Sequence, residues 1–384
     1  MKFYPFLMAF ILVPYIINSQ TAFHNFGNIE MHSDSEIGFH TDVINDGDFE
    51  NESGFVGFYS DSATRIVSGT NRPIFYNVEI DAINDLQLEN SLGIRNNLDF
   101  INGKVITPRD NVNISLDFIN FNLYVGEDND RHTDGYASVF GDKEFSFPIG
   151  NNDKLRPMII PPHSQNNYFR GAYFSEDPNT PTTFLSSFDT TEKQILVGNV
   201  SNYEFWDLDG TTETVVTLTW DQDSNIDQIA SNTNLLTVVG WSKSENQWVN
   251  LGGINITGDL ISGQLTSETF IPDEYEVITI GSILQGGDLA DDNFLISPNG
   301  DNVNDTLVFE GLELYKNNKL SIFNRWGNTV LEVDNYKNDW EGISQGPFTV
   351  DKSDGLPVGT YFYVLSFGND SLDRTLKGWV YINR

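Results

Sequence analysis

Short runs of alternating apolar and polar residues, separated by turn residues, dominate the chain from about residue 28 onward. Within residues 28–142 the clearest runs are 78–82, 86–88, 98–100 and 114–116. Asn and Asp flank these runs, and both tolerate the left-handed backbone of tight turns. The pattern predicts an irregular β-solenoid-like region over residues 20–142, in which each coil buries its inner row against the next. An antiparallel β-sandwich is the alternative, because the interval between runs is not constant.

A second strand-rich region covers residues 143–281. Its strongest alternation lies at 213–220, 235–241, 248–251 and 275–280. Several strands without a helical period predict an antiparallel sandwich of immunoglobulin-like size. We expect its tryptophans to serve as core and rim rather than as a sugar-binding platform, since aromatic residues dominate buried area. These are Trp206, Trp220, Trp241 and Trp248.

Prolines and glycines mark two interruptions in this region. The proline-rich stretch 161–187 is expected to lie outside the core sheets, because proline lacks the backbone donor of a central strand. Residues 282–292 contain a Gly-Gly pair and three aspartates, and they are predicted to form a linker.

The last region, residues 293–384, is predicted to be a second antiparallel sandwich. Residues 324–328 read as a hairpin turn that joins strands at 320–323 and 329–333. Further on, a turn near Gly359 leads into a strand that buries alternating aromatic residues. The fold class is therefore all-β, with a solenoid-like region followed by two sandwich domains.

The first nineteen residues differ from the rest of the chain. Lys2 supplies a positive charge, residues 6–17 are mostly apolar, and Ser19 is a small residue suited to cleavage. The apolar run is shorter than the roughly 20 residues that span a bilayer. We therefore predict an export signal peptide at residues 1–19.

The net charge restricts the partners. The 384 residues include 21 basic and 55 acidic side chains, a net charge of −34. Such a charge disfavours nucleic acid and anionic membranes and favours solubility. Residues 293–384 hold 8 of the basic and 12 of the acidic side chains, so this last region is nearly neutral. The absence of cysteine excludes thiol catalysis and disulfides.

Enzymatic motifs are missing from the sequence. The five histidines show no HExxH spacing, and no GxSxG elbow, P-loop or GxGxxG occurs. Carboxylate pairs such as Asp221 and Asp223 are the minimum for glycoside hydrolysis, but 55 acidic residues make such pairs inevitable. We expect no enzymatic activity and no catalytic residues.

One loop has the composition of a cation site. Asn299, Asp301 and Asp305 alternate as oxygen ligands of calcium do, and Glu310 falls at the twelfth position of a loop that begins at Asn299. The glycine of an EF-hand is absent at the sixth position, which is Asn304. Calcium binding is one interpretation, and an Asx-rich turn that caps backbone amides is the other.

Five sequence blocks in the last ninety residues occur in the order of a known family. They are LISPNGDNVND from residue 295, LSIFNRWGNTV from 320, WEG from 340, LPVGTYFYV from 356 and KGWVYINR from 377. This region resembles the gliding motility-associated C-terminal domain, the type B sorting domain of the type IX secretion system. Asn302 departs from the glycine that is usual in the first block. The blocks contain the residues that we predict for sorting and recognition: Asn324, Arg325, Trp326, Gly327, Gly359, Thr360, Tyr361, Lys377 and Gly378. For Arg325, Trp326 and also Trp340, the alternative to recognition is packing and turn support inside the sandwich.

The resemblance implies a secretion route and a set of partners. The chain would use the type IX secretion translocon together with an outer-membrane barrel of the PorP/SprF kind, and it would be retained at the cell surface. We expect a structural, adhesin-like or adaptor component of the gliding and adhesion apparatus, which can dock with a larger surface adhesin. The alternative is a secreted carbohydrate-binding module or carbohydrate-active enzyme with the same sorting domain.

Overall fold

A computed structural model describes residues 22–194, 196–284, 293–301, 303–309, 311–312, 315, 317–344, 355–368 and 374–384. The predicted signal peptide and most of the predicted linker lie outside the described residues. Strands make up 50% of the structure and helices 4%, which confirms the all-β class. The chain forms two compact units. The first runs to Gly141 and includes Asn152–Leu155, and the second contains Asp142–Asn151 and Arg156–Arg384.

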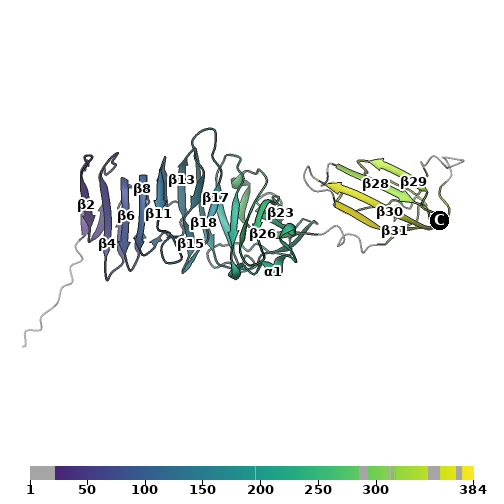
Figure 1. The fold of residues 1–384 in the computed structure, drawn as a ribbon, viewed down its shortest axis with the longest axis horizontal. Coiled ribbons are helices and arrows are strands. Elements are labelled where there is room, and N and C mark those ends of the chain that lie inside the picture. The colour runs from purple at the N-terminus through teal and green to yellow at the C-terminus, as the bar shows by residue number, and fades with distance from the viewer. Residues whose placement is uncertain are drawn as a thin grey trace, which may run out of the picture. The chain divides into compact units, whose positions relative to one another are not determined.

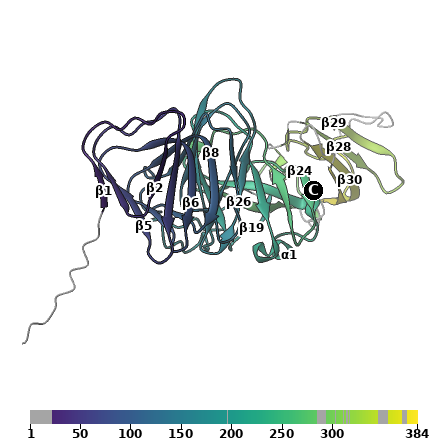
Figure 2. The same ribbon diagram turned by 60° about the vertical axis from the view of Figure 1, so that its left-hand side comes forward.

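The first unit is a parallel β-solenoid whose strands alternate between two sheets (Figures 1 and 2). One sheet contains β1 (Ala22–Asn25), β3 (Asp42–Asn45), β5 (Arg65–Ser68), β7 (Leu86–Leu88), β9 (Val105–Ile106) and β12 (Thr133–Asp134). The other contains β2 (Glu36–Phe39), β4 (Phe55–Ser60), β6 (Ile74–Ala82), β8 (Leu92–Asn102), β10 (Leu116–Ile119) and β13 (Ala137–Gly141). Neighbouring strands pair in parallel through about six turns, which confirms the solenoid and not the sandwich alternative.

The length of a coil varies along the solenoid. Leu86 faces Val105, 19 positions later, whereas Val105 faces Thr133, 28 positions later. The longer coil includes β11 (Leu123–Val125), which pairs with β8. This excursion explains why the spacing of strands in the sequence is uneven. The short strand β16 (Lys154–Leu155) also belongs to the first unit.

Phenylalanine rings stack through the interior of the first coils. The ring centroids of Phe39 and Phe58 lie 5.6 Å apart, those of Phe58 and Phe75 6.2 Å, and those of Phe49 and Phe75 4.8 Å. All four side chains are buried. Because each ring contacts rings of the neighbouring coil, the stack holds successive coils together by dispersion and apolar burial.

Asparagine side chains connect coils at one corner of the solenoid. The Asn25 amide donates a hydrogen bond to Oδ1 of Asn45 (2.8 Å), and the Asn45 amide donates to the backbone carbonyl of Asn71 (3.0 Å). Asn25 and Asn45 are buried, so these bonds satisfy polar groups that would otherwise be costly. Asp85 and Asn120 have positive φ, as predicted for Asx residues at turns.

The second unit begins with two antiparallel sheets, which are consistent with the predicted sandwich (Figure 1). One has the order β14 (Phe145–Phe147), β17 (Met158–Ile160), β21 (Thr217–Trp220), β25 (Gly263–Thr266), β24 (Ile254–Gly258). The other has the order β18 (Asn167–Phe174), β20 (Phe205–Asp209), β26 (Tyr275–Ile283), β22 (Leu236–Ser242), β23 (Trp248–Asn250), and β19 (Val197–Val200) pairs with β26. Outside these sheets lie β15 (Ile149–Asn151), η1 (Gln222–Ser224), α1 (Ile226–Ile229), η2 (Thr233–Leu235) and η3 (Pro272–Glu274).

Two predictions for this region have different outcomes. All four of its tryptophans are buried, with exposed fractions of 9% or less, which confirms their place in the core. The prediction that residues 161–187 lie outside the core sheets is wrong. Strand β18 lies within this stretch, pairs with β20 and is largely buried. Prolines occur only near the two ends of the stretch, and the residues between them are free to donate backbone hydrogen bonds.

The last part of the second unit is a five-stranded sheet. Its order is β27 (Phe294–Ile296), β31 (Arg374–Ile382), β30 (Gly359–Gly368), β28 (Asn317–Phe323), β29 (Thr329–Asp334). Only β27 runs parallel to its neighbour. Segments between the strands cover the inner face with buried side chains, and the cluster includes Leu307, Phe309, Tyr336 and Trp340.

Candidate functional site

The predicted hairpin turn is present in the C-terminal sheet. β28 and β29 pair antiparallel, with Phe323 opposite Thr329. The Oδ1 atom of Asn324 accepts hydrogen bonds from the backbone amides of Trp326 and Asn328, both at 3.0 Å. Gly327 has a φ of 81°, in the left-handed region that glycine adopts without strain. Asn324 and Gly327 therefore shape the turn that the sequence predicts at residues 324–328.

Arg325 and Trp326 lie at the exposed tip of this turn. The guanidinium carbon of Arg325 is 4.2 Å from the centroid of the Trp326 ring, and 72% of Trp326 is exposed. Trp340, in contrast, is buried. Its indole nitrogen donates to the carbonyl of Ile343 at 2.8 Å. The structure thus separates a core tryptophan from a surface tryptophan.

The second group of predicted residues lies at the same end of the sheet. β30 begins at Gly359 and runs antiparallel to β28, so that Phe362 faces Phe323, the last residue before the turn. Thr360 is exposed, whereas Tyr361 is largely buried and donates from its hydroxyl to the carbonyl of Pro357 at 3.0 Å. Burial raises the pKa of Tyr361, so the hydroxyl stays protonated at neutral pH.

Lys377 and Gly378 lie further along the sheet, on β31. Lys377 faces Val364 and is exposed, while Gly378 faces Tyr363. A Cβ atom at Gly378 would lie 2.7 Å from the ring of Tyr363, which is buried. Gly378 therefore makes room for a core tyrosine, and Lys377 is the member of this pair that a partner can reach.

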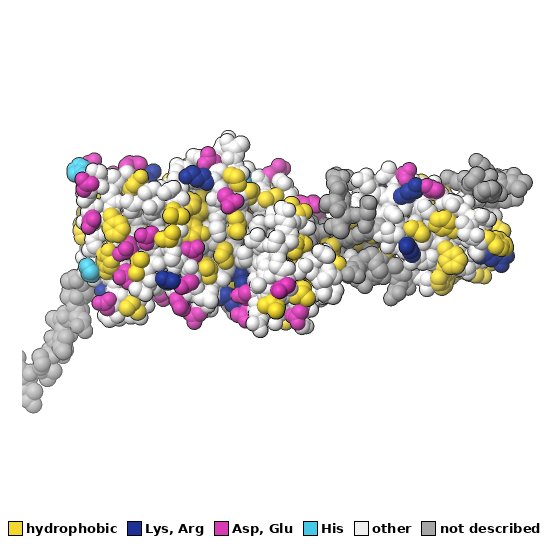
Figure 3. All heavy atoms as spheres, in the orientation of Figure 1, with side chains coloured by type: hydrophobic (Ala, Val, Ile, Leu, Met, Phe, Trp, Pro, Cys, Tyr) yellow, Lys and Arg dark blue, Asp and Glu magenta, His cyan; other side chains and the backbone are white. Residues whose placement is uncertain are grey.

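The outer face of the sheet carries apolar side chains that the sequence analysis did not assign to recognition. We call Leu295, Phe362, Trp379 and Tyr381 the outer strip; their exposed fractions are 54%, 48%, 40% and 37%. Phe362 faces Trp379 across β30 and β31, and Leu295 faces Tyr381 across β27 and β31. Together with Asn293, Phe294 and Thr360, they line an open groove. Figure 3 shows hydrophobic side chains gathered on the surface of this part of the chain.

The predicted calcium loop contains a network of Asx turns. Oδ1 of Asp305 accepts hydrogen bonds from the backbone amides of Asn299 and Gly300, both at 2.9 Å. Oδ1 of Asp301 accepts from the amide of Val303 at 2.8 Å, and Oδ2 accepts from the Asn299 side chain at 3.0 Å. These are the contacts that the turn interpretation requires. Among the described residues no three Asp, Glu or His side chains are grouped as metal ligands, and Glu310 lies outside them. Calcium binding stays a prediction.

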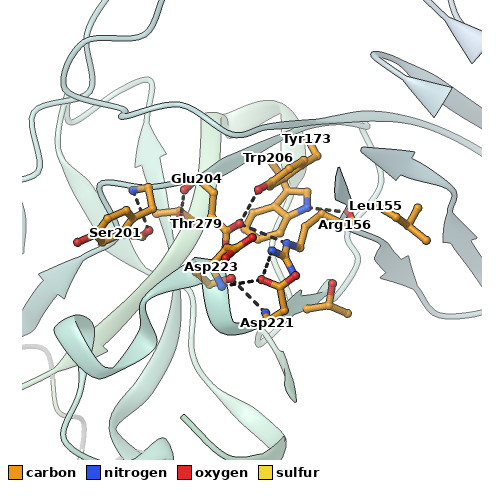
Figure 4. Close-up of polar contacts among 12 residues, drawn as sticks. Leu155, Arg156, Tyr173, Ser201, Glu204, Trp206, Asp221, Asp223 and Thr279 are labelled. Atoms are coloured by element: carbon orange, nitrogen blue, oxygen red, sulfur yellow. Dashed lines mark hydrogen bonds and ion pairs between the residues drawn. The ribbon is translucent and has the colours of Figure 1, made fainter. Parts of the chain in front are cut away.

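A charged cluster in the second unit, buried except for the partly exposed Asp221, was also not predicted (Figure 4). Arg156 donates from Nη2 to Oδ1 of Asp221 at 2.6 Å, and its Nε lies 3.2 Å from Oε2 of Glu204 without hydrogen-bond geometry. Tyr173 donates to the same Glu204 oxygen at 2.6 Å. Burial opposes the charge of Arg156, but the neighbouring carboxylates outweigh it and raise its pKa.

This cluster has the contacts of a structural element. Asp221 also accepts the Asp223 backbone amide at 2.9 Å and so caps η1. The backbone amide of Arg156 donates to the carbonyl of Ile149 at 2.8 Å, which ties two neighbouring segments together. The carboxylate of Asp221 therefore binds Arg156 and caps η1. The pair Asp221 and Asp223 is for this reason not arranged as two carboxylates around a substrate.

These features define a strand-built C-terminal domain with a supported hairpin tip and an exposed apolar face. Residues 290–382 match the CHU_C Type IX secretion signal domain. The chain therefore carries the C-terminal sorting domain of gliding motility-associated proteins, which confirms the resemblance seen in the sequence. Comparisons with curated proteins and with solved structures give no significant match.

The sorting domain fixes the export route. It indicates a protein that is secreted through the type IX system and that interacts with the type IX secretion machinery. Cargo of this system is secreted and often attached to the cell surface. In the part of the chain that the structure describes, no helix is long and apolar enough to cross a membrane.

Proposed function

We propose that this protein is a cell-surface structural component of the adhesion and gliding apparatus, adhesin-like or an adaptor, without enzymatic activity. The observation that carries the proposal is the pairing of a type IX sorting domain with a parallel β-solenoid in one chain. A solenoid stacks repeats along one direction and offers extended surfaces for other macromolecules. The sorting domain brings such a surface to the exterior of the cell.

The charge distribution supports a binding role outside the cell. Of the net charge of −34, only −4 belongs to residues 293–384, so the remaining residues carry −30. Acidic side chains are spread over the visible face of the solenoid (Figure 3). Such a surface stays soluble and favours basic partners or divalent cations. A larger surface adhesin and a PorP/SprF-like barrel are the partners that we propose.

A secreted carbohydrate-binding module or carbohydrate-active enzyme is the alternative from another class. Its sequence basis is the abundance of tryptophan and carboxylate pairs. The four tryptophans of the second region are buried, and Asp221 is engaged with Arg156, so neither feature forms a sugar site among the described residues. The first proposal has the stronger support for this reason.

Deletion of the gene in its host distinguishes the two. We expect the deletion strain to attach to a surface and to glide less well than its parent, with unchanged growth on polysaccharides. Complementation with the full chain should restore both properties. Normal attachment and gliding together with lost growth on one polysaccharide would favour the alternative.

A further inference from the structure

The strands that carry the outer strip, β27, β30 and β31, contain no acidic residue. The strand β28, which pairs with β30, contains none either. The acidic residues of the sheet, Glu332 and Asp334, lie on its other edge strand, β29. An apolar surface without carboxylates is easier to desolvate than the rest of the molecule.

Folding of the domain does not account for the side chains of the outer strip. The core is built from the opposite face of the same strands, where Tyr361, Tyr363 and Leu365 are buried. Trp379 and Phe362 point away from that core and remain 40% and 48% exposed. Large exposed aromatic side chains that line a groove are typical of protein interaction sites, in which Trp, Tyr and Arg carry most of the binding energy.

The identity of the partner follows from where the outer strip lies. All four of its residues fall within residues 290–382, and the interaction of that domain is with the type IX secretion machinery. The hairpin tip with Arg325 and Trp326 lies at the end of the sheet where Phe362 faces Phe323. The outer strip and the tip together offer an apolar face with a cation at its end.

We propose that the outer strip, with the hairpin tip at its end, is the surface by which the folded sorting domain docks onto the type IX secretion machinery. This inference rests on the export route assigned above and adds the contact residues to it. The partner surface is apolar at its centre, to cover Phe362 and Trp379. It carries an acceptor or an acidic group opposite Arg325, because that guanidinium lies at the exposed end.

Secretion of full-length variants by a type IX-competent host tests the proposal. In Phe362→Ser/Trp379→Ser we expect the secreted fraction to fall about tenfold, with accumulation in the periplasm, because two exposed hot-spot rings are lost. Trp379→Phe keeps an aromatic ring and should be secreted nearly as well as the wild type. The melting temperature of each purified variant shows whether the fold is intact.

The control for these variants removes exposed apolar side chains that lie outside residues 290–382. Leu123 and Tyr168 have exposed fractions of 52% and 47%, close to those of Phe362 and Trp379. Leu123→Ser/Tyr168→Ser removes a similar apolar area and should leave secretion unchanged. If the Phe362/Trp379 variant unfolds, Leu295→Ser replaces it, since Leu295 is 54% exposed on the edge strand β27.

A deletion of residues 293–384, measured in parallel, separates this inference from the export route. If the deletion blocks secretion but the variants of the outer strip are secreted like the wild type, the docking surface is wrong and the route stands. If the deletion is secreted, the route itself fails. Normal secretion of the variants with a loss of self-association or of polysaccharide binding would also overturn the proposal, because the outer strip would then serve another partner.

Discussion

Arg156 and Glu204 form a buried ion pair in the second unit, with 3.2 Å between Nε and Oε2. Both residues are 2% exposed, and they are 48 positions apart in the sequence. The pair is completed by the buried hydroxyl of Tyr173, which donates to Glu204, and by Asp221, which is partly exposed and pairs with Arg156. Burial and the charge of Glu204 raise the pKa of Tyr173, which keeps this donor protonated.

Breaking this pair should destabilise the protein strongly. In Arg156→Met the carboxylate of Glu204 loses its cation in a buried site, and we expect a loss of about 3–5 kcal/mol in the free energy of unfolding. Arg131→Met is the matched control, because Arg131 pairs with Asp128 at the surface, where solvent screening leaves such pairs with little effect on stability. Denaturant unfolding measures both, and equal effects of the two substitutions would contradict a stabilising role of the buried pair.

The aromatic stack of the solenoid makes a second prediction. Phe75 is fully buried and contacts Phe49 and Phe58. Phe75→Ala should lower the free energy of unfolding by about 3–5 kcal/mol, through lost burial and the cavity left behind. Phe140→Ala is the control, since Phe140 is 41% exposed and the loss should be much smaller. A solenoid that tolerates both substitutions equally would not be held together by this stack.

His132 gives the solenoid a predicted dependence on pH. It is fully buried, its Nδ1 lies 3.0 Å from the carbonyl of Asp128, and desolvation lowers its pKa. The unfolded state, with a pKa near 6.5, therefore binds a proton before the folded state does. As the pH falls below about 6.5, the free energy of unfolding should fall by up to about 1.4 kcal/mol per pH unit, until the lower folded pKa is reached.

A substitution isolates the contribution of this histidine. His132→Gln removes the titrating group and should flatten the decline between pH 7 and pH 5. His40→Gln removes an exposed imidazole instead and serves as the control. Urea unfolding at each pH provides the comparison, and a decline that is as steep in His132→Gln as in the wild type would assign the pH dependence to other groups.

Calcium binding at Asn299, Asp301 and Asp305 is a further prediction. An ion that binds only the folded state adds about 2.7 kcal/mol at a free concentration about 100 times the dissociation constant. Millimolar calcium should then raise the melting temperature of the full chain, and magnesium should raise it less, because magnesium loses its waters reluctantly. The gain should vanish in Asp301→Ala/Asp305→Ala. An equal calcium effect on this variant and on the wild type would leave the loop as a turn only.

The solenoid could be predicted from the sequence because the residues at its turns form a recognisable pattern. Asn and Asp at the coil corners and short alternating runs between them are local features, so they are visible without a structure. The pairing of strands is not local. The excursion through β11 lengthens one coil to 28 positions, and no single period fits all coils.

The candidate site was predicted in part for similar reasons. The hairpin at residues 324–328 is a local turn, and its asparagine and glycine are typical of such turns. The outer strip was missed because β30 carries aromatic residues on both faces: Tyr361 and Tyr363 are buried while Phe362 between them is exposed. Alternation cannot show which face is covered when both faces carry aromatic residues. The sequence likewise does not show that Trp340 is buried and Trp326 exposed, because the burial of a side chain depends on segments that are distant in the sequence.

The central claim is that residues 293–384 direct export through the type IX system, and a reporter tests it most directly. A fluorescent protein placed between a signal peptide and residues 293–384 is expressed in a host with a functional type IX system, and the fraction outside the cell is measured. We predict that the reporter reaches the exterior and that it stays in the periplasm when residues 293–384 are removed or when the host lacks the secretion machinery. Equal amounts of reporter outside the cell with and without residues 293–384 would contradict the account.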